Sequence, residues 1–214
     1  MKYFDEKNSM KIEDINFIAN EIKNGKIAVF PTETVYGIGT NAFDEKACKK
    51  IYDIKNRPVE KALIVLISDM HMLQELVKDV NDIEERLIKK FWPGALTIIF
   101  GKKKNGKLPE VVTAGKDTVA VRMTDGEISR MIVQRAGVPV VAPSANLSGN
   151  PSGTKMKNIM NDLEQKVDYI LDFGDIQDDT TSTVVRVKNN KIQILRKGKI
   201  LKEQLKEITE VEEI

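Results

Sequence analysis

Short apolar runs of strand length are mixed along this chain with longer stretches of helical spacing, and the two kinds do not alternate strictly. The strand-like runs lie at residues 26–30, 62–67, 96–100, 118–123, 138–141, 169–171, 183–187 and 192–195. Helical spacing predicts helices at residues 12–22, 44–55, 70–77, 82–91, 127–136, 155–165 and 201–211. Such mixing favours an α/β fold with a single-domain twisted mixed sheet flanked by helices, rather than a regular doubly wound fold.

Composition sets wide bounds on the class of protein. The 214 residues, 41% hydrophobic and 31% charged, suffice for one domain with a sizeable core, so we expect a single domain over 1–214 that ends in a C-terminal helix, with no second domain. Lys plus Arg exceed Asp plus Glu only by 34 to 32, which argues against a global basic field for nucleic acid. The lone Cys48 is expected in the core. No apolar leader or membrane span is evident, which indicates a cytoplasmic protein without a membrane partner.

Residues 31–37, Pro-Thr-Glu-Thr-Val-Tyr-Gly, follow the apolar run at 27–30. Pro31 lacks an N–H for a ladder, so the strand should end there and lead into a loop with two hydroxyls, a carboxylate and a phenol. Such a loop at a strand end can bind a small polar ligand. The alternative is an ordinary strand-to-helix connection, whose Thr and Glu side chains cap a helix.

Two further segments have binding chemistry. Residues 55–61, Lys-Asn-Arg-Pro-Val-Glu-Lys, place three cations in seven residues where Pro58 ends a helix, and these suit phosphate or carboxylate. A solvated charged surface is the alternative. Residues 142–154 form a loop rich in hydroxyls, amides and glycines, whose small side chains let backbone N–H groups approach an anion.

Six motifs, in this order, resemble those of the YrdC-like threonylcarbamoyl-AMP synthases. They are the 31–37 loop, the Lys-x-Arg at 55–57, Phe-Trp-Pro-Gly-Ala-Leu-Thr at 91–97, Val-Ala-Val-Arg at 119–122, Ser-x-Asn at 144–146 and Ser-Thr-Val-Val at 182–185. The resemblance covers about residues 12–196 and implies a twisted α/β sheet with a concave basic ligand-binding face. It also implies the short, single-domain form of the family.

The resemblance implies a nucleotidyltransferase that joins L-threonine, bicarbonate and ATP into threonylcarbamoyl-adenylate and releases pyrophosphate. The product would pass to a downstream tRNA-modifying threonylcarbamoyl transferase for the threonylcarbamoyladenosine modification of tRNA. Two alternatives stay open: a module that binds double-stranded RNA or tRNA without catalysis, and a carbamoyl-transfer domain related to hydrogenase maturation.

The resemblance also assigns roles to particular side chains. The catalytic cations would be Lys55 and Arg57. Threonine would be bound by Thr34, Arg122, Ser144 and Ser182. The nucleotide would be bound by Arg57, Lys61, Thr118, Asn146, Thr154 and Arg196. We expect no protein metal site, since the sole histidine, His71, has no Cys partner nearby, and no tightly bound cofactor; Mg²⁺ would arrive with ATP.

Three positions depart from the family pattern. Leu66 stands where many relatives have His, Arg186 replaces an Asp, and Lys197 replaces the usual Pro. None of them is a residue assigned above to phosphate or carboxylate binding.

Overall fold

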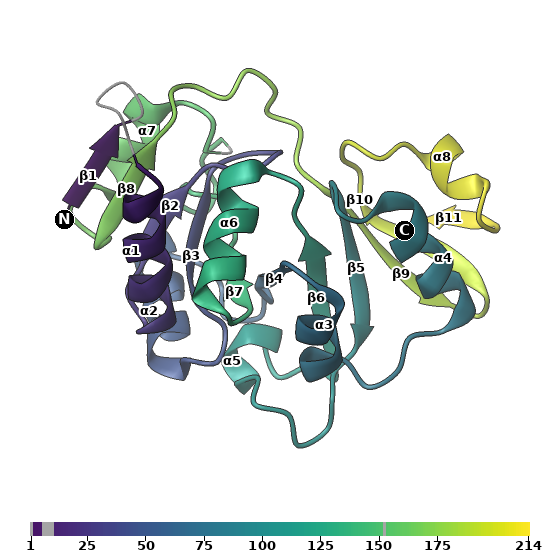
Figure 1. Cartoon of the computed structure of the whole chain (residues 1–214). Helices are drawn as coiled ribbons and strands as arrows, with labels where there is room; N and C mark the ends of the chain where they lie inside the picture. Colours follow the sequence, from purple (N-terminus) through teal and green to yellow (C-terminus); the bar gives the residue numbers. More distant parts are fainter. Residues whose placement is uncertain (1, 6–10, 152) are drawn as a thin grey trace.

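The computed structural model describes residues 2–5, 11–151 and 153–214. In that part of the chain, eleven strands form one sheet in the order β1-β8-β2-β3-β7-β4-β6-β5-β9-β10-β11 (Figure 1). The strands are β1 (Lys2–Asp5), β2 (Ala28–Phe30), β3 (Gly37–Asn41), β4 (Ile64–Ile67), β5 (Leu96–Gly101), β6 (Thr118–Met123), β7 (Val140–Val141), β8 (Tyr169–Asp172), β9 (Thr183–Lys188), β10 (Lys191–Arg196) and β11 (Val211–Glu213). The helices are α1 (Ile12–Lys23), α2 (Glu45–Lys55), α3 (Met70–Leu76), α4 (Asp82–Phe91), α5 (Glu110–Thr113), α6 (Glu127–Ala136), α7 (Met156–Leu163) and α8 (Lys202–Lys206).

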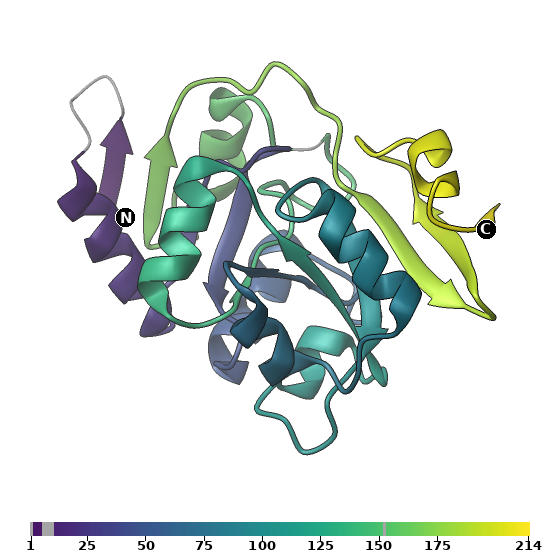
Figure 2. The same cartoon turned by 45° about the vertical axis from the view of Figure 1, so that its right-hand side comes forward.

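The sheet is mixed, as the sequence predicts. Strand β6 lies parallel to β4 and antiparallel to β5, and β5 continues parallel to β9. Figure 1 shows α1 and α6 packed side by side in front of the central strands. Figure 2 shows β9 and β10 as a twisted hairpin, with α8 beside it. The prediction of a mixed α/β sheet flanked by helices is confirmed.

Local sequence explains where the principal helices begin and end. Helix α4 starts with a capping box, in which Asn81 Oδ1 accepts from the Glu84 N–H at 3.0 Å and Glu84 Oε2 accepts from the Asn81 N–H at 3.0 Å. Helix α2 starts at Asp44, whose side chain caps Ala47 N, and ends at Asn56 in the left-handed region with φ 48°. The left-handed turn at the end of α2 directs the cationic segment, residues 55–61, back toward the sheet.

The strands divide their side chains between two faces. On β6, Val119 and Val121 enter the core, whereas Thr118, Ala120 and Arg122 project from the opposite face. Each fully buried Val or Leu contributes about 1.5–3 kcal/mol relative to an exposed one, so the strand's register is strongly fixed. The polar face of β6 is therefore held in place by the apolar one.

Several sequence-based element predictions need correction. Residues 31–36 connect β2 to the antiparallel strand β3, so the alternative of a strand-to-helix connection is wrong. The closing helix predicted for 201–211 is wrong in extent: α8 ends at Lys206, and β11 then pairs parallel with β10, with Val211 opposite Ile192. Strands β1, β3 and β11 and helix α5 were not expected from the sequence. None of the helices in the described ranges has the length and apolar character needed to span a bilayer.

Candidate functional site

The 31–37 loop is shaped by its own hydroxyls. Thr32 Oγ1 donates to the Val35 carbonyl at 2.6 Å and accepts from the Thr34 N–H at 3.2 Å. These short-range bonds close a turn between β2 and β3. Tyr36 anchors the end of the loop, since its hydroxyl donates to the Gly174 carbonyl at 2.8 Å and accepts from Phe173 N at 2.9 Å. Burial raises the pKa of Tyr36 above its ordinary value.

The 142–154 loop lies directly alongside the 31–37 loop. Ala145 N donates to the Tyr36 carbonyl at 2.7 Å, and Tyr36 N donates to the Gly153 carbonyl at 2.8 Å. Gly37 also forms an isolated antiparallel bridge with Ser144. The structure thus brings together two of the three segments that the sequence singles out.

A pocket opens where these loops meet the ends of the central strands. Its walls come from both loops, from the loop after α2, from β6 and from the residues that flank the β9–β10 hairpin. The lining residues are Thr32, Thr34, Val35, Tyr36, Gly37, Arg57, Ile64, Arg122, Ala142, Pro143, Ser144, Thr181, Ser182 and Arg196.

Three arginines make the pocket electropositive. Arg57 donates from Nε to the Lys61 carbonyl at 2.9 Å and from Nη2 to the Ala62 carbonyl at 2.8 Å. Arg196 donates from Nε and Nη2 to the Ser182 carbonyl at 3.1 and 2.7 Å. Partial burial, together with the charges of Arg122 and Arg57, lowers the pKa of Arg196 to about 10. Within the described residues, neither Arg57 nor Arg196 pairs with a carboxylate, so this charge is available to an anionic ligand.

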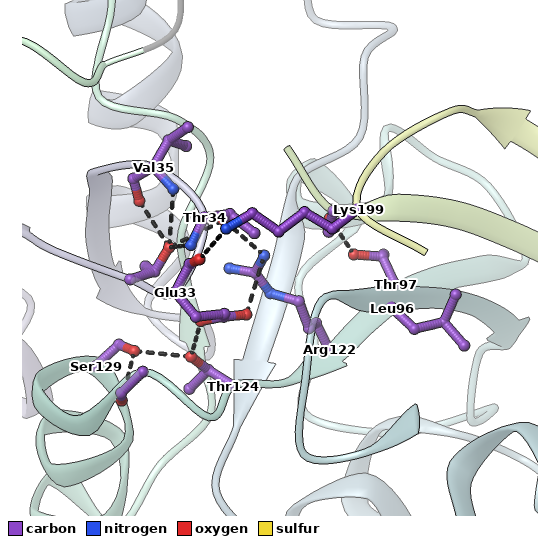
Figure 3. Close-up of polar contacts among 12 residues, drawn as sticks. Glu33, Thr34, Val35, Leu96, Thr97, Arg122, Thr124, Ser129 and Lys199 are labelled. Atoms are coloured by element: carbon purple, nitrogen blue, oxygen red, sulfur yellow. Dashed lines mark hydrogen bonds and ion pairs between the residues drawn. The ribbon is translucent and has the colours of Figure 1, made fainter. Parts of the chain in front are cut away.

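Arg122 is buried at the floor of the pocket, with 5% of its surface exposed. Its Nη1 donates to Thr34 Oγ1 at 3.0 Å and lies 3.3 Å from Glu33 Oε1 (Figure 3). Desolvation lowers the pKa of Arg122, and Glu33 opposes this shift. Its Nε and Nη2 donate no hydrogen bond to any residue that the structure describes. Since Nε is also shut off from solvent, Nη2 is the guanidinium nitrogen through which Arg122 can bind a carboxylate in the pocket.

Thr34 and Ser182 present different hydrogen-bonding groups to a ligand. Thr32 Oγ1 donates to the Val35 carbonyl and accepts from the N–H groups of Thr34 and Val35 at 3.2 and 3.3 Å, so its 3.0 Å contact with Thr34 Oγ1 does not use up the hydrogen of Thr34. Thr34 Oγ1 accepts from Arg122, and one lone pair is left. Thr34 therefore offers the ligand an acceptor as well as a donor.

Ser182 offers a donor. Its Oγ accepts from Arg196 Nη2 at 2.9 Å and lies 2.8 Å from Thr97 Oγ1. Thr97 is fully buried, and Ser182 is the hydrogen-bond partner that the structure gives its hydroxyl. Thr97 satisfies its hydrogen only by donating to Ser182, which leaves the Ser182 hydrogen free to point at a ligand.

Lys55 lies elsewhere than the sequence predicts for a phosphate-binding cation. It is 2% exposed, it does not line the pocket, and its ammonium donates to the carbonyls of Ser144 and Asn146. It also donates to Asn146 Oδ1 at 3.3 Å, and this oxygen accepts from Ser144 Oγ at 2.6 Å. Burial, reinforced by Arg57 and opposed by Asp162, lowers the pKa of Lys55 to about 7. In this structure Lys55 holds the Ser-x-Asn loop rather than facing the pocket.

The other residues predicted to contact the nucleotide lie outside the pocket lining. Lys61 is exposed, and Thr154 is buried, with its carbonyl accepting from Ile176 N at 2.9 Å. Thr118 shares the polar face of β6 with Arg122 but stands four residues away, roughly 13 Å along the strand. Asn146 lines a second, neighbouring pocket with Asn150 and other amides. Their nucleotide roles stay predictions.

Sequence reasoning missed several polar residues of the site. Glu33 is part of a recognised motif, but its partners Arg122 and Thr124 are 89 and 91 positions away, so no local pattern identifies them. Thr97 was visible as a hydroxyl in an apolar strand. Lys199, which donates to the Glu33 carbonyl at 2.6 Å and pairs with Asp178 at 3.2 Å, gave no signal.

The three departures from the family pattern fit their surroundings. Leu66 is fully buried and sits beside Arg122 in the β4–β6 register. Arg186 donates from Nε to Gln193 at 2.7 Å, and Lys197 pairs with Glu213 at 2.7 Å.

The described residues contain no cluster of three or more His, Cys, Asp or Glu side chains that could hold a metal ion. The described residues that line the pocket include no carboxylate, and Glu33, beside Arg122, is engaged by Arg122 and Thr124. A divalent cation in this pocket would thus have to be held by the ligand's phosphates and by water.

Comparisons with known proteins agree with this geometry. The family model of the Sua5, YciO and YrdC proteins, described as "Telomere recombination", matches residues 20–198. Threonylcarbamoyl-AMP synthases of Pyrococcus abyssi and Bacillus subtilis are 39% and 41% identical over 91% and 87% of this chain. This chain spans 56% and 54% of those two relatives, about half their length. A putative synthase of Methanocaldococcus jannaschii is 39% identical, and 86% of its length is covered.

Solved structures give the same result. The structure of P. abyssi Sua5 complexed with L-threonine superposes with a TM-score of 0.90 at 36% identity, covering 98% of this chain and 62% of that one. E. coli YciO, with a TM-score of 0.80 at 23% identity, covers 92% of this chain and 95% of its own and supports the fold alone. Since the family model covers most of the chain and the relatives exceed 30% identity, this chain belongs to the Sua5/YciO/YrdC family.

Proposed function

We propose that this chain forms threonylcarbamoyl-adenylate and pyrophosphate from L-threonine, bicarbonate and ATP. The observation that carries the proposal is the unpaired Nη2 of Arg122, a residue that lines one pocket together with Arg57 and Arg196. The names of the curated relatives, and the L-threonine in the P. abyssi complex, support the same substrate.

The pocket's polarity suits threonine. Arg122 would donate to the carboxylate from Nη2, and the free hydrogen of Ser182 would donate to the same group. The remaining lone pair of Thr34 would accept from the threonine hydroxyl or amine. A site that reads a hydroxyl in this way rejects an analogue that lacks it, because its own polar groups are then left unpaired.

The reaction needs charge neutralisation and alignment. The threonine amine attacks the carbon of bicarbonate, a C–O bond of bicarbonate breaks, and water leaves as the carbamate forms. A carbamate oxygen then attacks the α-phosphorus of ATP as the bond to pyrophosphate breaks. Every reactant carries a negatively charged group, so the cations Arg57 and Arg196 would gather the phosphates and hold them in line. No pocket side chain is needed as general base, because the amine can lose its proton to solvent. Mg²⁺, when bound with ATP, would supply further neutralisation of the triphosphate.

One incubation tests the proposal. The purified protein is mixed with ATP, labelled bicarbonate and single amino acids, and pyrophosphate and labelled adenylate are measured. We expect both products with threonine, little of either with serine and hardly any with valine, and a lack of both products with threonine would refute the proposal. Transfer of the labelled threonylcarbamoyl group to tRNA would also require the downstream transferase, which we propose as the enzyme that uses the adenylate. Direct RNA binding and the cytoplasmic location stay predictions.

A further inference from the structure

Glu33 pairs with Nη1 of Arg122, which is not the nitrogen that would bind a ligand. Its Oε1 is 3.3 Å from Arg122 Nη1 and accepts no hydrogen bond within the described part of the chain, so this oxygen is committed to the ion pair. The side chains of Glu33 and Arg122 are only 13% and 6% exposed. Thr34 Oγ1 accepts from the same Nη1 at 3.0 Å. Two partners thus fix Nη1, while Nη2 is left for the ligand.

A second layer fixes Glu33 itself. Its Oε2 accepts from the Thr124 hydroxyl at 2.5 Å, and Thr124 lies 2.7 Å from the hydroxyl of Ser129 in the first turn of α6 (Figure 3). Thr124 and Ser129 are both fully buried. The Thr124 hydrogen is donated to Glu33, and the one hydrogen of Ser129 is shared between Thr124 Oγ1 and the Gly126 carbonyl, which lies 3.0 Å from Ser129 Oγ. The two hydroxyls thus form a short relay that ties the carboxylate to the start of α6.

The backbone of Glu33 is held as tightly as its side chain. Lys199 donates to the Glu33 carbonyl at 2.6 Å. On the other side, a Cβ placed on Gly126 would lie 2.7 Å from Glu33 N and 2.8 Å from Ser129 Oγ, so only glycine allows this approach. The start of α6 and the 31–37 loop are therefore fitted to each other around one carboxylate.

We propose that Glu33 is a positioning residue for amino-acid recognition. It aims Nη2 of Arg122 into the pocket, and the Thr124–Ser129 pair sets the geometry of Glu33. The proposal rests on the proposed function, because the carboxylate that Arg122 would bind is taken to be that of L-threonine. Glu33 touches neither substrate, so its effect is confined to the threonine end of the site.

Three substitutions at Glu33 and Thr124 test geometry separately from charge. Glu33→Gln removes the ion pair, Glu33→Asp keeps the charge on a shorter chain, and Thr124→Val removes the donor with little change in shape. The Kd for L-threonine is measured by calorimetry, and the Kd for a nonhydrolysable ATP analogue is measured in parallel. We expect the threonine Kd to rise roughly tenfold for both Glu33 variants and about threefold for Thr124→Val. The Kd of the ATP analogue should change less than about twofold.

Coupling and controls decide the outcome. Thr124→Val should add nothing to Glu33→Gln, since the relay acts through the carboxylate. The matched control is Glu45→Gln, which removes an exposed ion pair with Lys49 on α2 and should leave both Kd values unchanged. Wild-type affinity in Glu33→Asp, or tighter threonine binding in Glu33→Gln, would overturn positioning in favour of charge alone. Equal loss of both ligands, with a lowered melting temperature, would show a merely structural role. A wild type that binds no threonine refutes the proposed function instead.

Discussion

Ser182→Ala separates two roles that one hydroxyl plays in this fold. The change removes the acceptor to which the fully buried Thr97 hydroxyl donates, and it removes the free donor that faces the pocket. A buried donor left without a partner costs about 1–3 kcal/mol of unfolding free energy. For a domain of this size, each kcal/mol corresponds to a fall in melting temperature of about 2–4 °C. The lost bond to a carboxylate should weaken threonine binding roughly tenfold.

A second substitution resolves the two effects. Thr97→Val in the Ser182→Ala background removes the unpaired hydroxyl with little change in shape, so most of the lost stability should return. Threonine affinity should not return, because the donor to the ligand is still missing. The assay is thermal unfolding together with threonine titration of the wild type, both single variants and the double variant. Recovery of threonine binding in the double variant, or unchanged binding in Ser182→Ala, would refute the assignment of Ser182 as a donor.

Three more substitutions test the site. Arg57→Ala should lower pyrophosphate release about a hundredfold or more while the protein stays folded, because its charge faces the pocket and its own partners are carbonyls; retention of most activity would contradict this. Lys55→Met tests how stability depends on pH. Because the pKa of Lys55 is lowered to about 7, the unfolded chain carries a proton between pH 7 and about 10 that the folded chain has lost. The free energy of unfolding should therefore rise with pH more steeply in the wild type than in the variant. Parallel urea-unfolding results at pH 7, 8 and 9 would show that the pKa is not lowered. In pyrophosphate assays at saturating ATP and bicarbonate, serine should be used weakly and valine hardly at all, and Thr34→Val should narrow the gap between threonine and valine; a wild type that uses valine as well as threonine would rule out hydroxyl reading.

Most helices and strands could be predicted because their hydrophobic spacing and end residues are visible in the local sequence. The predicted helix 82–91 matches α4, whose capping box is written in Asn81 and Glu84. Strand β3 was missed because Gly-Ile-Gly-Thr-Asn has low β-propensity, and pairing with β2 and β7 supplies what the residues lack. The C-terminal segment was also predicted wrongly because tertiary pairing overrides the local pattern. Val211 fits a helical pattern, yet it pairs with Ile192 in a strand at the edge of the sheet.

The site was predictable in its segments but not in its contacts. The three segments meet, and Arg57, Arg122, Ser144, Ser182 and Arg196 line one pocket with Thr34. Lys55 could not be placed, because a lysine after a helix looks exposed, whereas the carbonyls that surround its ammonium come from a loop about 90 residues later. Long-range packing decides whether a cation faces a ligand or a carbonyl, and the local pattern of residue types does not predict that packing.

The crossing from β8 to β9 has a consequence for how this protein folds. The chain between Asp172 and Thr183 passes six strands of the sheet before β9 takes its place beside β5 (Figure 1). Ser182 and Arg196 join the pocket only through that late, long-range pairing, and contacts of such large sequence separation form slowly. A refolding chain should therefore complete the pocket only after β9 has paired with β5. A bound ligand can slow unfolding of the complete fold, but it cannot speed refolding, because the pocket does not exist before that pairing.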